Sequence, residues 1–280
     1  MGRRRLETYE DYDRALRQGF GCGEFKTYTP WHRVQDFGSK GQSSKIPGIT
    51  VHRPHHVLSN IEKALFLHIE RDKTVIDIRE QFPILPLCLT EAIANEIGIK
   101  HPRTRSRKAP WVISTDILAT RGKEGAETYH AYAGKNSIDL LNRRTMELLE
   151  LERLSCLALG MTWHLATELQ FDENVTSNLD WASEVLRGRV KRKRAAGLSD
   201  DLKYSVAQSI SVGAHALPVL IGRIATDFQI DEGLALLALR VAIWENLIDV
   251  DLTVPIQRSG TVVVTKRAVE TRKGACRAVG

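Results

Sequence analysis

Three charged residues of this sequence have side chains of the kind that phosphodiester hydrolysis uses. Asp116 lies within the strand-like run WVISTDILAT, Glu62 stands near the start of a helical pattern, and Lys135 follows a second strand-like run. An ionised acid in a buried strand is costly unless a base, N–H donors or a metal meets it. Two carboxylates can hold Mg²⁺ through hard oxygen ligands, while a lysine orients the attacking water or steadies charge at phosphorus. These residue types therefore fit a metal-dependent site, although their spacing alone does not bring them together.

Each of the three residues also has an ordinary structural explanation. Glu62 stands three residues after Ser59, the spacing of a capping box, so its carboxylate could return to the backbone N–H of Ser59. Asp116 could be a strand-end acid bonded to neighbouring amides. Lys135 could be a surface lysine, as most lysines are. Residue spacing leaves both explanations open for each side chain.

The elements that would position these residues follow from the periodicity of the apolar side chains. Glu62 belongs to a helix expected to begin at Ser59, and Asp116 belongs to the first strand of a hairpin closed by the turn RGKEG. Because Lys135 directly follows the second strand, the hairpin would bring the acid and the lysine to one edge of a sheet. The expected strands are 31–37, 74–82, 112–119, 128–133 and 161–167, and the expected helices are 7–17, 59–71, 90–98 with Thr90 as its cap, and 145–160.

The pattern becomes mainly helical beyond about residue 169. The expected helices are 173–190, 201–212, 216–228 and 231–247, followed by the alternating run LIDVDLTV and the short run GTVVVTK. Helices followed by a small hairpin describe a winged helix, and Arg240 would be available to a DNA groove if its helix is a recognition helix. We therefore expect an α/β domain, residues 1–168, with a mixed sheet flanked by helices, followed by a mainly helical winged-helix domain, residues 169–280.

The composition is that of a globular protein that works inside the cell. Of the 280 residues, 42% are hydrophobic and 26% are charged, which suits two domains that each have a core. No apolar run approaches the roughly 18 residues needed to span a bilayer. The basic first residues are followed by acids instead of the apolar core of a signal peptide. The four cysteines form no C-x-x-C pair, so we expect a cytoplasmic protein without a zinc site, a disulfide framework or a membrane partner.

The positive charge is concentrated in two segments. HPRTRSRK, residues 101–108, has four cationic side chains and no acid, and RGRVKRKR, residues 187–194, has six and no acid. Such clusters attract phosphate backbones without reading base sequence. Either segment alone could be a solvated loop or linker. Together, in a chain of net charge +6, they favour nucleic acid as a partner.

Six short segments resemble one known family. In order along the chain they are HHVLSNIEKALFL, VIDIREQFPILP, IKHP, STDIL, GKNS and TMELLELER. Together they resemble the TnsA family, the endonuclease subunit of heteromeric Tns transposases, from about Thr29 to Arg153 and more weakly into the helical second half. These segments in sequence, in a chain of this length, are a more specific match than any lone motif.

The resemblance implies a fold, an activity and partners. The fold is a restriction-endonuclease-like catalytic domain followed by a winged-helix domain. The family's first glutamate falls on Glu62, its strand aspartate on Asp116 and its lysine on Lys135, with the two acids as ligands of Mg²⁺, for which Mn²⁺ could substitute. The implied activity is cleavage of double-stranded DNA at the 5′ ends of a transposon in cut-and-paste transposition. The implied partners, in a prokaryotic cytoplasm, are transposon-end DNA, a TnsB-like transposase that cuts and joins the 3′ ends, and a TnsC-like ATPase regulator.

One position departs from the pattern of the family. An acid or amide usually stands two residues before the lysine, and here that position is Ala133. Either Glu62 and Asp116 suffice with backbone carbonyls and waters, or another acid such as Glu150 substitutes, or one metal position is weakened or cleavage is lost. A catalytically weakened DNA-binding adaptor between transposase and ATPase therefore stands beside the endonuclease hypothesis. A stand-alone restriction-type nuclease, which would cleave without partners, is a further alternative.

Overall fold

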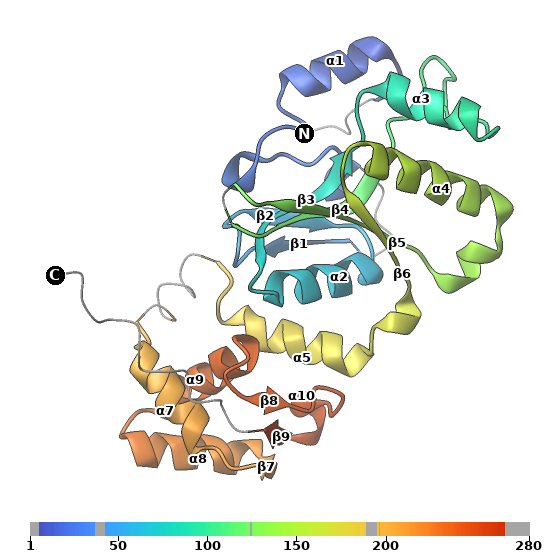
Figure 1. Cartoon of the computed structure of the whole chain (residues 1–280). Coiled ribbons are helices and arrows are strands. Elements are labelled where there is room, and N and C mark those ends of the chain that lie inside the picture. The colour runs from blue at the N-terminus through green and yellow to red at the C-terminus, as the bar shows by residue number, and fades with distance from the viewer. Residues whose placement is uncertain (1–5, 37–42, 124, 189–194, 196, 267–280) are drawn as a thin grey trace. The chain divides into compact units, whose positions relative to one another are not determined.

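The computed structural model describes residues 6–36, 43–123, 125–188, 195 and 197–266 (Figure 1). The chain divides into two compact units, residues 1–171 and residues 172–280. Among the described residues, no helix is both long enough and apolar enough to cross a membrane.

A mixed sheet of four strands forms the centre of the first unit (Figure 1). The strands β3 (Val75–Pro83), β4 (Ser114–Arg121), β5 (Thr128–Gly134) and β6 (Thr162–Ala166) lie side by side in this order. Strands β3, β4 and β5 pair antiparallel, whereas β6 runs parallel to β5. Parallel neighbours need a long crossover connection, and here the connection contains the helix α4 (Arg143–Ala158). The predicted mixed sheet is confirmed.

Helices cover both faces of this sheet (Figure 1). The helix α2 (Asn60–Arg71) lies on one face, and α3 (Leu87–Glu96) lies with α4 on the other. Successive side chains of a strand point to opposite faces, so Ile117 joins the core cluster that contains Phe66, while Leu118 joins the cluster that contains Leu151. Full burial of one such side chain contributes roughly 1.5–3 kcal/mol. Burial on both faces explains the nearly continuous apolar run around Asp116.

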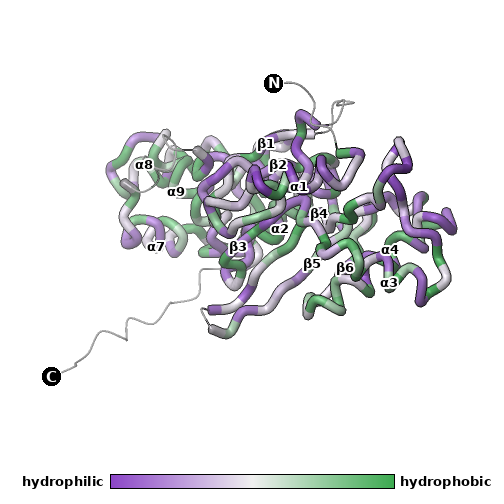
Figure 2. The backbone as a smooth tube through the Cα atoms, turned by 90° about the horizontal axis from the view of Figure 1, so that it is seen from above, coloured by the Kyte–Doolittle hydropathy of each residue, from purple (hydrophilic) through white to green (hydrophobic). Residues whose placement is uncertain are grey.

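Strands β4 and β5 form the predicted hairpin. Arg121 pairs with Thr128 beside the turn, and the turn passes through Gly122, whose φ of +112° suits glycine. Figure 2 shows this hydrophilic turn at the end of the hairpin that points away from α3 and α4. Asp116 and Lys135 both lie toward the other end of the hairpin, as the sequence predicts.

The helix boundaries follow from their caps. The side chain of Ser59 accepts a hydrogen bond from the backbone of Glu62 and starts α2 where the pattern predicts it. Asn142 caps α4 in the same way, and the helix begins at Arg143, two residues ahead of the predicted start. The predicted cap of α3 is wrong, because the helix follows Pro86 and its buried Thr90 lies inside it, where the hydroxyl donates to the carbonyl of Leu87 (2.9 Å).

The amino-terminal segment differs from the sequence-based prediction. The helix α1 (Tyr9–Arg17) forms as expected, but the predicted strand at 31–37 is not formed by residues 31–36, where Val34–Asp36 make a short 3-10 turn. Residue 37 lies outside the described residues. A hairpin of β1 (Ser44–Pro47) and β2 (Pro54–Val57) forms instead. Its inward side chains include buried histidines in place of apolar residues, so it lacks the alternation that reveals a strand.

The second unit consists of helices and a small antiparallel sheet. Among its described residues the helices are α5 (Glu173–Glu184), α7 (Asp200–Ser209), α8 (Leu217–Phe228), α9 (Glu232–Trp244) and α10 (Ile256–Ser259), and the strands are β7 (Gly213–Ala216), β8 (Asp249–Val250) and β9 (Thr261–Lys266). The strands lie in the order β7-β9-β8. The sequence did not predict β7, and β8 is much shorter than the run LIDVDLTV.

The helix α9 packs against α5, α7 and α8 and forms the core of this unit. Leu237, Val241 and Trp244 are buried on it. Arg240 is not available to a DNA groove, which corrects the expectation from the sequence. Its guanidinium lies 4.9 Å from the ring centroid of Trp181 and donates to the carbonyl oxygen of the same residue.

Candidate active site

Two of the three predicted residues, Glu62 and Asp116, meet at one end of the sheet, where β4 begins and β5 ends. Glu62 lies in the first turn of α2 and is buried, and Asp116 projects from the beginning of β4. The backbone N–H of Gly134, the last residue of β5, donates to Oδ2 of Asp116 (2.8 Å). A Cβ atom at position 134 would lie 3.0 Å from Cγ2 of Ile61 and 3.6 Å from that carboxylate oxygen, so glycine allows α2, β4 and β5 to approach closely.

The side chain of Gln81 joins the two acids. Its Nε2 donates to Oε2 of Glu62 (3.2 Å) and to Oδ1 of Asp116 (3.3 Å). Gln81 lies on β3, is buried, and has a φ of +48°, a left-handed conformation that residues other than glycine rarely adopt. Sequence reasoning missed this residue. The only signal was that Gln81 is a polar residue that follows Glu80 in the segment DIREQF. Strand alternation alone does not show whether such a side chain is buried or exposed.

The capping-box explanation of Glu62 is not what forms. The hydroxyl of Ser59 accepts from the backbone N–H of Glu62 (3.1 Å), but the carboxylate accepts from the N–H of Leu58 (2.9 Å) instead of the N–H of Ser59. One carboxylate oxygen of Glu62 is therefore shared between the N–H of Leu58 and the amide of Gln81. The Glu62 carboxylate therefore accepts a hydrogen bond at the amino-terminal end of α2 and also belongs to the acid pair.

Burial raises the pKa of both acids, and the charge of Asp116 adds to the rise at Glu62. Burial, followed by the charge of Asp116, raises the pKa of Glu62 to about 8, although hydrogen bonds from Leu58, Ser59 and Gln81 act against the rise. Burial also raises the pKa of Asp116, and the N–H of Gly134, the charge of Lys135 and the amide of Gln81 counteract it. Two carboxylates with only partial compensation favour a proton or a cation between them.

Lys135 lies beside this pair and is exposed. Its backbone N–H donates to the carbonyl of Ala166 (2.9 Å), which continues the pairing of β5 with β6 by one residue. Its positive charge acts on Asp116, where it lowers the pKa of the carboxyl. The structure thus gathers all three predicted residues at the end of the β4–β5 hairpin opposite the turn.

A third carboxylate, Glu152 of α4, belongs to the same electrostatic neighbourhood. It is buried, and Nε1 of Trp163 donates to its Oε1 (3.2 Å). Burial and the charge of Asp116 raise its pKa to about 8, while Trp163, Thr115 and the charge of Lys135 act to lower it. Glu150 of the same helix, the substitute ligand suggested by the sequence, is half-buried and pairs with Arg153, its Oε1 2.6 Å from Nη2.

The donor set for a metal ion consists of oxygen atoms. Ala133 is buried at 1% exposure and contributes no side-chain oxygen at the position where the family usually has an acid or amide. Within the part of the chain that the structure describes, no group of three or more His, Cys, Asp and Glu side chains is placed to hold a metal ion. The carboxylates of Glu62 and Asp116 are hard oxygen donors, which suits a cation of the magnesium type.

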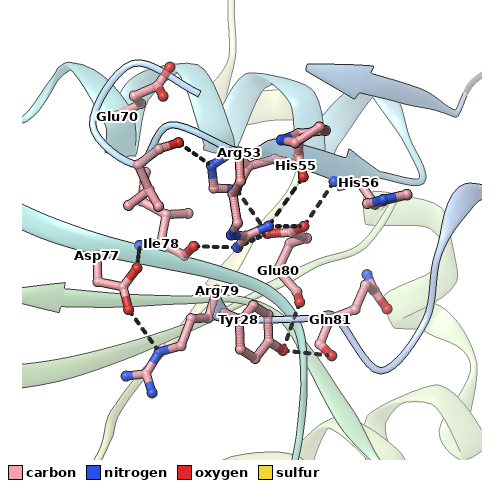
Figure 3. Close-up of polar contacts among 12 residues, drawn as sticks. Tyr28, Arg53, His55, His56, Glu70, Asp77, Ile78, Arg79, Glu80 and Gln81 are labelled. Atoms are coloured by element: carbon pink, nitrogen blue, oxygen red, sulfur yellow. Dashed lines mark hydrogen bonds and ion pairs between the residues drawn. The ribbon is translucent and has the colours of Figure 1, made fainter. Parts of the chain in front are cut away.

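Glu80, the residue before Gln81, has a very different environment (Figure 3). Arg53 donates to both of its oxygens (2.7 and 2.6 Å), the backbone N–H of His56 donates to Oε1 (3.0 Å), and Nδ1 of His55 lies 2.9 Å from Oε2. Burial acts to raise the pKa of Glu80, but the hydrogen bonds and charges of His55 and Arg53 outweigh it and hold that pKa well below its ordinary value. The network fixes β3 directly beside the acid pair.

The backbone at Gln81 is held from the other side as well (Figure 3). The hydroxyl of Tyr28 donates to the carbonyl of Glu80 (3.0 Å) and lies 3.4 Å from the carbonyl of Gln81, and the N–H of Trp31 donates to the latter carbonyl (3.2 Å). An uncommon backbone conformation persists only where its surroundings determine it, and such positions cluster at functional sites. The surroundings of Gln81 meet this condition.

The first basic segment forms an exposed loop in the same unit. A bridge between Arg103 and Pro110 closes it, and four cationic side chains are exposed: Arg103, Arg105, Arg107 and Lys108. Exposed cations of this kind are suited to phosphate contacts. The second basic segment lies outside the described residues from 189 to 194, and its first member, Arg187, is buried.

Comparison with known proteins agrees with this fold and site. A mixed sheet flanked by helices, with paired acids at its edge, fits a restriction-endonuclease-like nuclease domain, and residues 72–168 match the family described as TnsA-like endonuclease N terminal. Asp116, Lys135 and Glu152 lie inside this match, and Glu62 precedes it.

A relative with a known role in transposition identifies the family. Over 186 residues the chain is 38% identical to the Transposon Tn7 transposition protein TnsA of Escherichia coli. The matched region covers 66% of this chain and 67% of that protein. The chain belongs to the TnsA family, which confirms the resemblance seen in the sequence. Membership of this family supports an endonuclease subunit of a transposase.

Proposed function

We propose that this protein is the Mg²⁺-dependent endonuclease subunit of a TnsABC-type transposase and cleaves DNA at the 5′ ends of the transposon during cut-and-paste transposition. The observation that carries the proposal is the convergence of Glu62 and Asp116 at one sheet edge, where Gln81 links them and the charge of Lys135 acts on Asp116. Membership of the TnsA family supports the same reaction class.

The two acids would hold the cation, because their carboxylates are incompletely compensated oxygen donors that meet at one point. When bound, Mg²⁺ supplies charge stabilisation at phosphorus and promotes ionisation of the attacking water, and Mn²⁺ can substitute for it. Gly134 holds the carboxylate of Asp116 through its backbone N–H, and Leu58 holds that of Glu62, so both oxygens are oriented before substrate arrives. Lys135 is exposed at this edge and steadies the charge of the scissile phosphate.

Glu152 would act through Lys135. Its carboxyl lies within electrostatic reach of both Lys135 and Asp116, and the indole N–H of Trp163 fixes its orientation. A carboxyl buried beside the site attracts the lysine side chain inward when it is ionised. Glu152 is therefore proposed as a positioning residue, not a ligand.

We assign the cleavage chemistry to residues 1–168 and binding of DNA and partner proteins to residues 169–280. From α7 onward the second unit has the element order α7-β7-α8-α9-β8-α10-β9 with the sheet order β7-β9-β8, and the helices followed by a small antiparallel sheet support a winged helix. The proposed partners are transposon-end DNA, a TnsB-like transposase and a TnsC-like ATPase regulator. The exposed cations of residues 101–108 favour contact of the first unit with phosphates as well.

A second candidate function is a catalytically weakened adaptor that bridges DNA, the transposase and the ATPase. Ala133 favours it, because this buried side chain offers nothing to a cation at the position where the family usually has an acid or amide. The two candidates differ in whether the assembled complex cuts the 5′ strand.

Strand-resolved cleavage of transposon-end DNA tests the choice. The protein is combined with its cognate TnsB-like and TnsC-like partners and Mg²⁺ or Mn²⁺, and wild type is compared with Asp116→Ala and with Asp13→Ala, an exposed aspartate of α1, as a control. We expect 5′ cleavage by wild type and the control and none by Asp116→Ala. An assembly that cuts the 3′ ends but leaves the 5′ ends intact with wild type would favour the adaptor.

A further inference from the structure

Gln81 makes the same contact with two acids that come from different elements. Its amide nitrogen lies 3.2 Å from Glu62 of α2 and 3.3 Å from Asp116 of β4, and the side chain itself projects from β3. Both hydrogen bonds are long and share one nitrogen. They hold the carboxylates at a common point, where only a small polar group separates them.

The conformation of Gln81 is built by its neighbours. Its φ is +48°, although it lies in a strand. The hydrogen-bonded carboxylate of the preceding Glu80 holds the chain on one side, and Tyr28 and Trp31 hold the backbone carbonyl of Gln81 on the other. A strand residue with ordinary dihedral angles would alternate away from its neighbours' face. The left-handed step at Gln81 therefore re-aims one side chain toward the acid pair.

The position two residues before Lys135 leaves a gap in the donor set. Ala133 lies on β5, on the opposite side of β4 from β3, and has no oxygen in its side chain. We propose that Gln81 completes the cation site from β3, with its amide oxygen acting in place of the side chain that Ala133 lacks. The inference rests on the proposed cation-dependent function and names a further ligand for it.

An amide suits this position for two reasons. Its carbonyl oxygen is an ordinary ligand of magnesium-type cations, and it adds no third negative charge to two carboxyls whose pKa values burial already raises. The terminal torsion of a glutamine is soft. The nitrogen can therefore hold the two acids when no cation is present, and half a turn presents the oxygen when one is bound.

Two substitutions separate the oxygen of Gln81 from its N–H groups. Gln81→Met keeps the length of the side chain and removes both groups, while Gln81→Glu keeps oxygen and removes the N–H donors. Binding of Mn²⁺ to the full chain without DNA is measured by isothermal titration, and thermal unfolding without cation reports whether each variant folds. We expect Mn²⁺ to bind Gln81→Met about 10-fold or more weakly than wild type, and Gln81→Glu at least as tightly as wild type.

The chain offers a matched control. Gln229 ends α8 with a φ of +52°, is exposed and belongs to the second unit, so Gln229→Met and Gln229→Glu make the same chemical changes in the same backbone region. Both should bind Mn²⁺ as wild type does. Affinity of Gln81→Met within about twofold of wild type would overturn the proposal, and so would Gln81→Glu binding more weakly than wild type.

A further variant distinguishes failure of this inference from failure of the proposed function. Asp116→Asn removes a carboxylate charge from the site and should abolish the tight Mn²⁺ binding event. If Asp116→Asn lacks that event and Gln81→Met retains it, the cation site stands and the role of Gln81 is refuted. If Asp116→Asn binds Mn²⁺ like wild type, the cation site itself is misplaced, and both the proposed function and this inference lose their support.

Discussion

Glu80 and the pair of Glu62 and Asp116 are carboxylates on neighbouring elements of one unit, and they differ in what surrounds them. Glu80 is fully buried, receives two hydrogen bonds from the guanidinium of Arg53, and has its pKa held well below the ordinary value. The pair has backbone N–H groups and one shared amide, and burial raises the pKa of both members. A full positive charge in direct contact is present in one case and absent in the other.

The difference separates a structural carboxylate from a functional one. Glu80 has no remaining demand for positive charge, because Arg53 and the neighbouring donors satisfy both oxygens. The acid pair has oxygens arranged at one point and charge that neutral donors only partly balance. Groups whose burial and neighbours shift the pKa toward neutrality are characteristic of functional sites. A cation of magnesium type would supply the missing positive charge.

The largest expected effect of a single change is on cleavage, at Glu62. Glu62→Gln removes one carboxylate charge from the pair, so we expect 5′-strand cleavage to fall on the order of 10³-fold or more. The free energy of unfolding should stay the same or rise, because repulsion between the two acids disappears. Strand-resolved cleavage and urea unfolding measure the two quantities. A variant that cleaves normally would show that the pair is not the catalytic centre.

Glu80→Gln should lower the free energy of unfolding, which Glu62→Gln should not. Removing this charge leaves Arg53 buried without its partner, and we expect the free energy of unfolding to fall by about 3 kcal/mol. Urea unfolding of Glu80→Gln beside Glu62→Gln gives a direct comparison of the same chemical change at the two sites. Equal effects at both positions would contradict the distinction between them.

Acid should weaken the contribution of Glu80 to stability. The pKa of Glu80 is lower in the folded protein than its value of about 4.3 in an unfolded chain. Its contribution is therefore fully present above that unfolded value and is lost as pH falls toward the folded value. The stability difference between wild type and Glu80→Gln should shrink between about pH 6 and about pH 2, as chemical unfolding at each pH would show. A constant difference over this range would argue against a depressed pKa.

The smallest of these effects is expected at Glu152. If Glu152 acts only by positioning Lys135, Glu152→Gln should reduce cleavage by about 10-fold, far less than Glu62→Gln. Mn²⁺ binding should be nearly unchanged, since the cation ligands remain in place. Glu150→Gln, in the same helix but only half-buried and paired with Arg153, is the matched control and should cleave as wild type does. Loss of cation binding in Glu152→Gln would make it a ligand instead.

Some features of the two sites could be predicted from the sequence and others could not. The sheet, α2 and α4 could be predicted because their apolar periodicities are long and their caps are local signals, as at Ser59. Glu62, Asp116 and Lys135 could be named from their residue types and the family pattern. The hairpin predicts that Asp116 and Lys135 lie near each other. The approach of Glu62 to Asp116 could not be predicted, because it depends on how α2 packs against the sheet.

The residues that sequence reasoning missed are those whose role depends on tertiary contacts. Gln81 faces the acids only because its backbone is left-handed, and Glu152 differs from Glu150 only in the helix face it occupies. The β1–β2 hairpin was missed because its buried side chains include His55 and His56, which are satisfied by partners elsewhere in the chain. A polar residue in a strand looks exposed until its partners are known.

Anomalous diffraction from crystals of the full chain soaked in Mn²⁺ locates the bound cation itself. We expect a peak within ligand distance of carboxylate oxygens from both Glu62 and Asp116, no peak at Glu80, and loss of the peak in Asp116→Asn. At saturating Mn²⁺, a structure without a peak at the acid pair, or one whose peak persists in Asp116→Asn, would contradict this expectation.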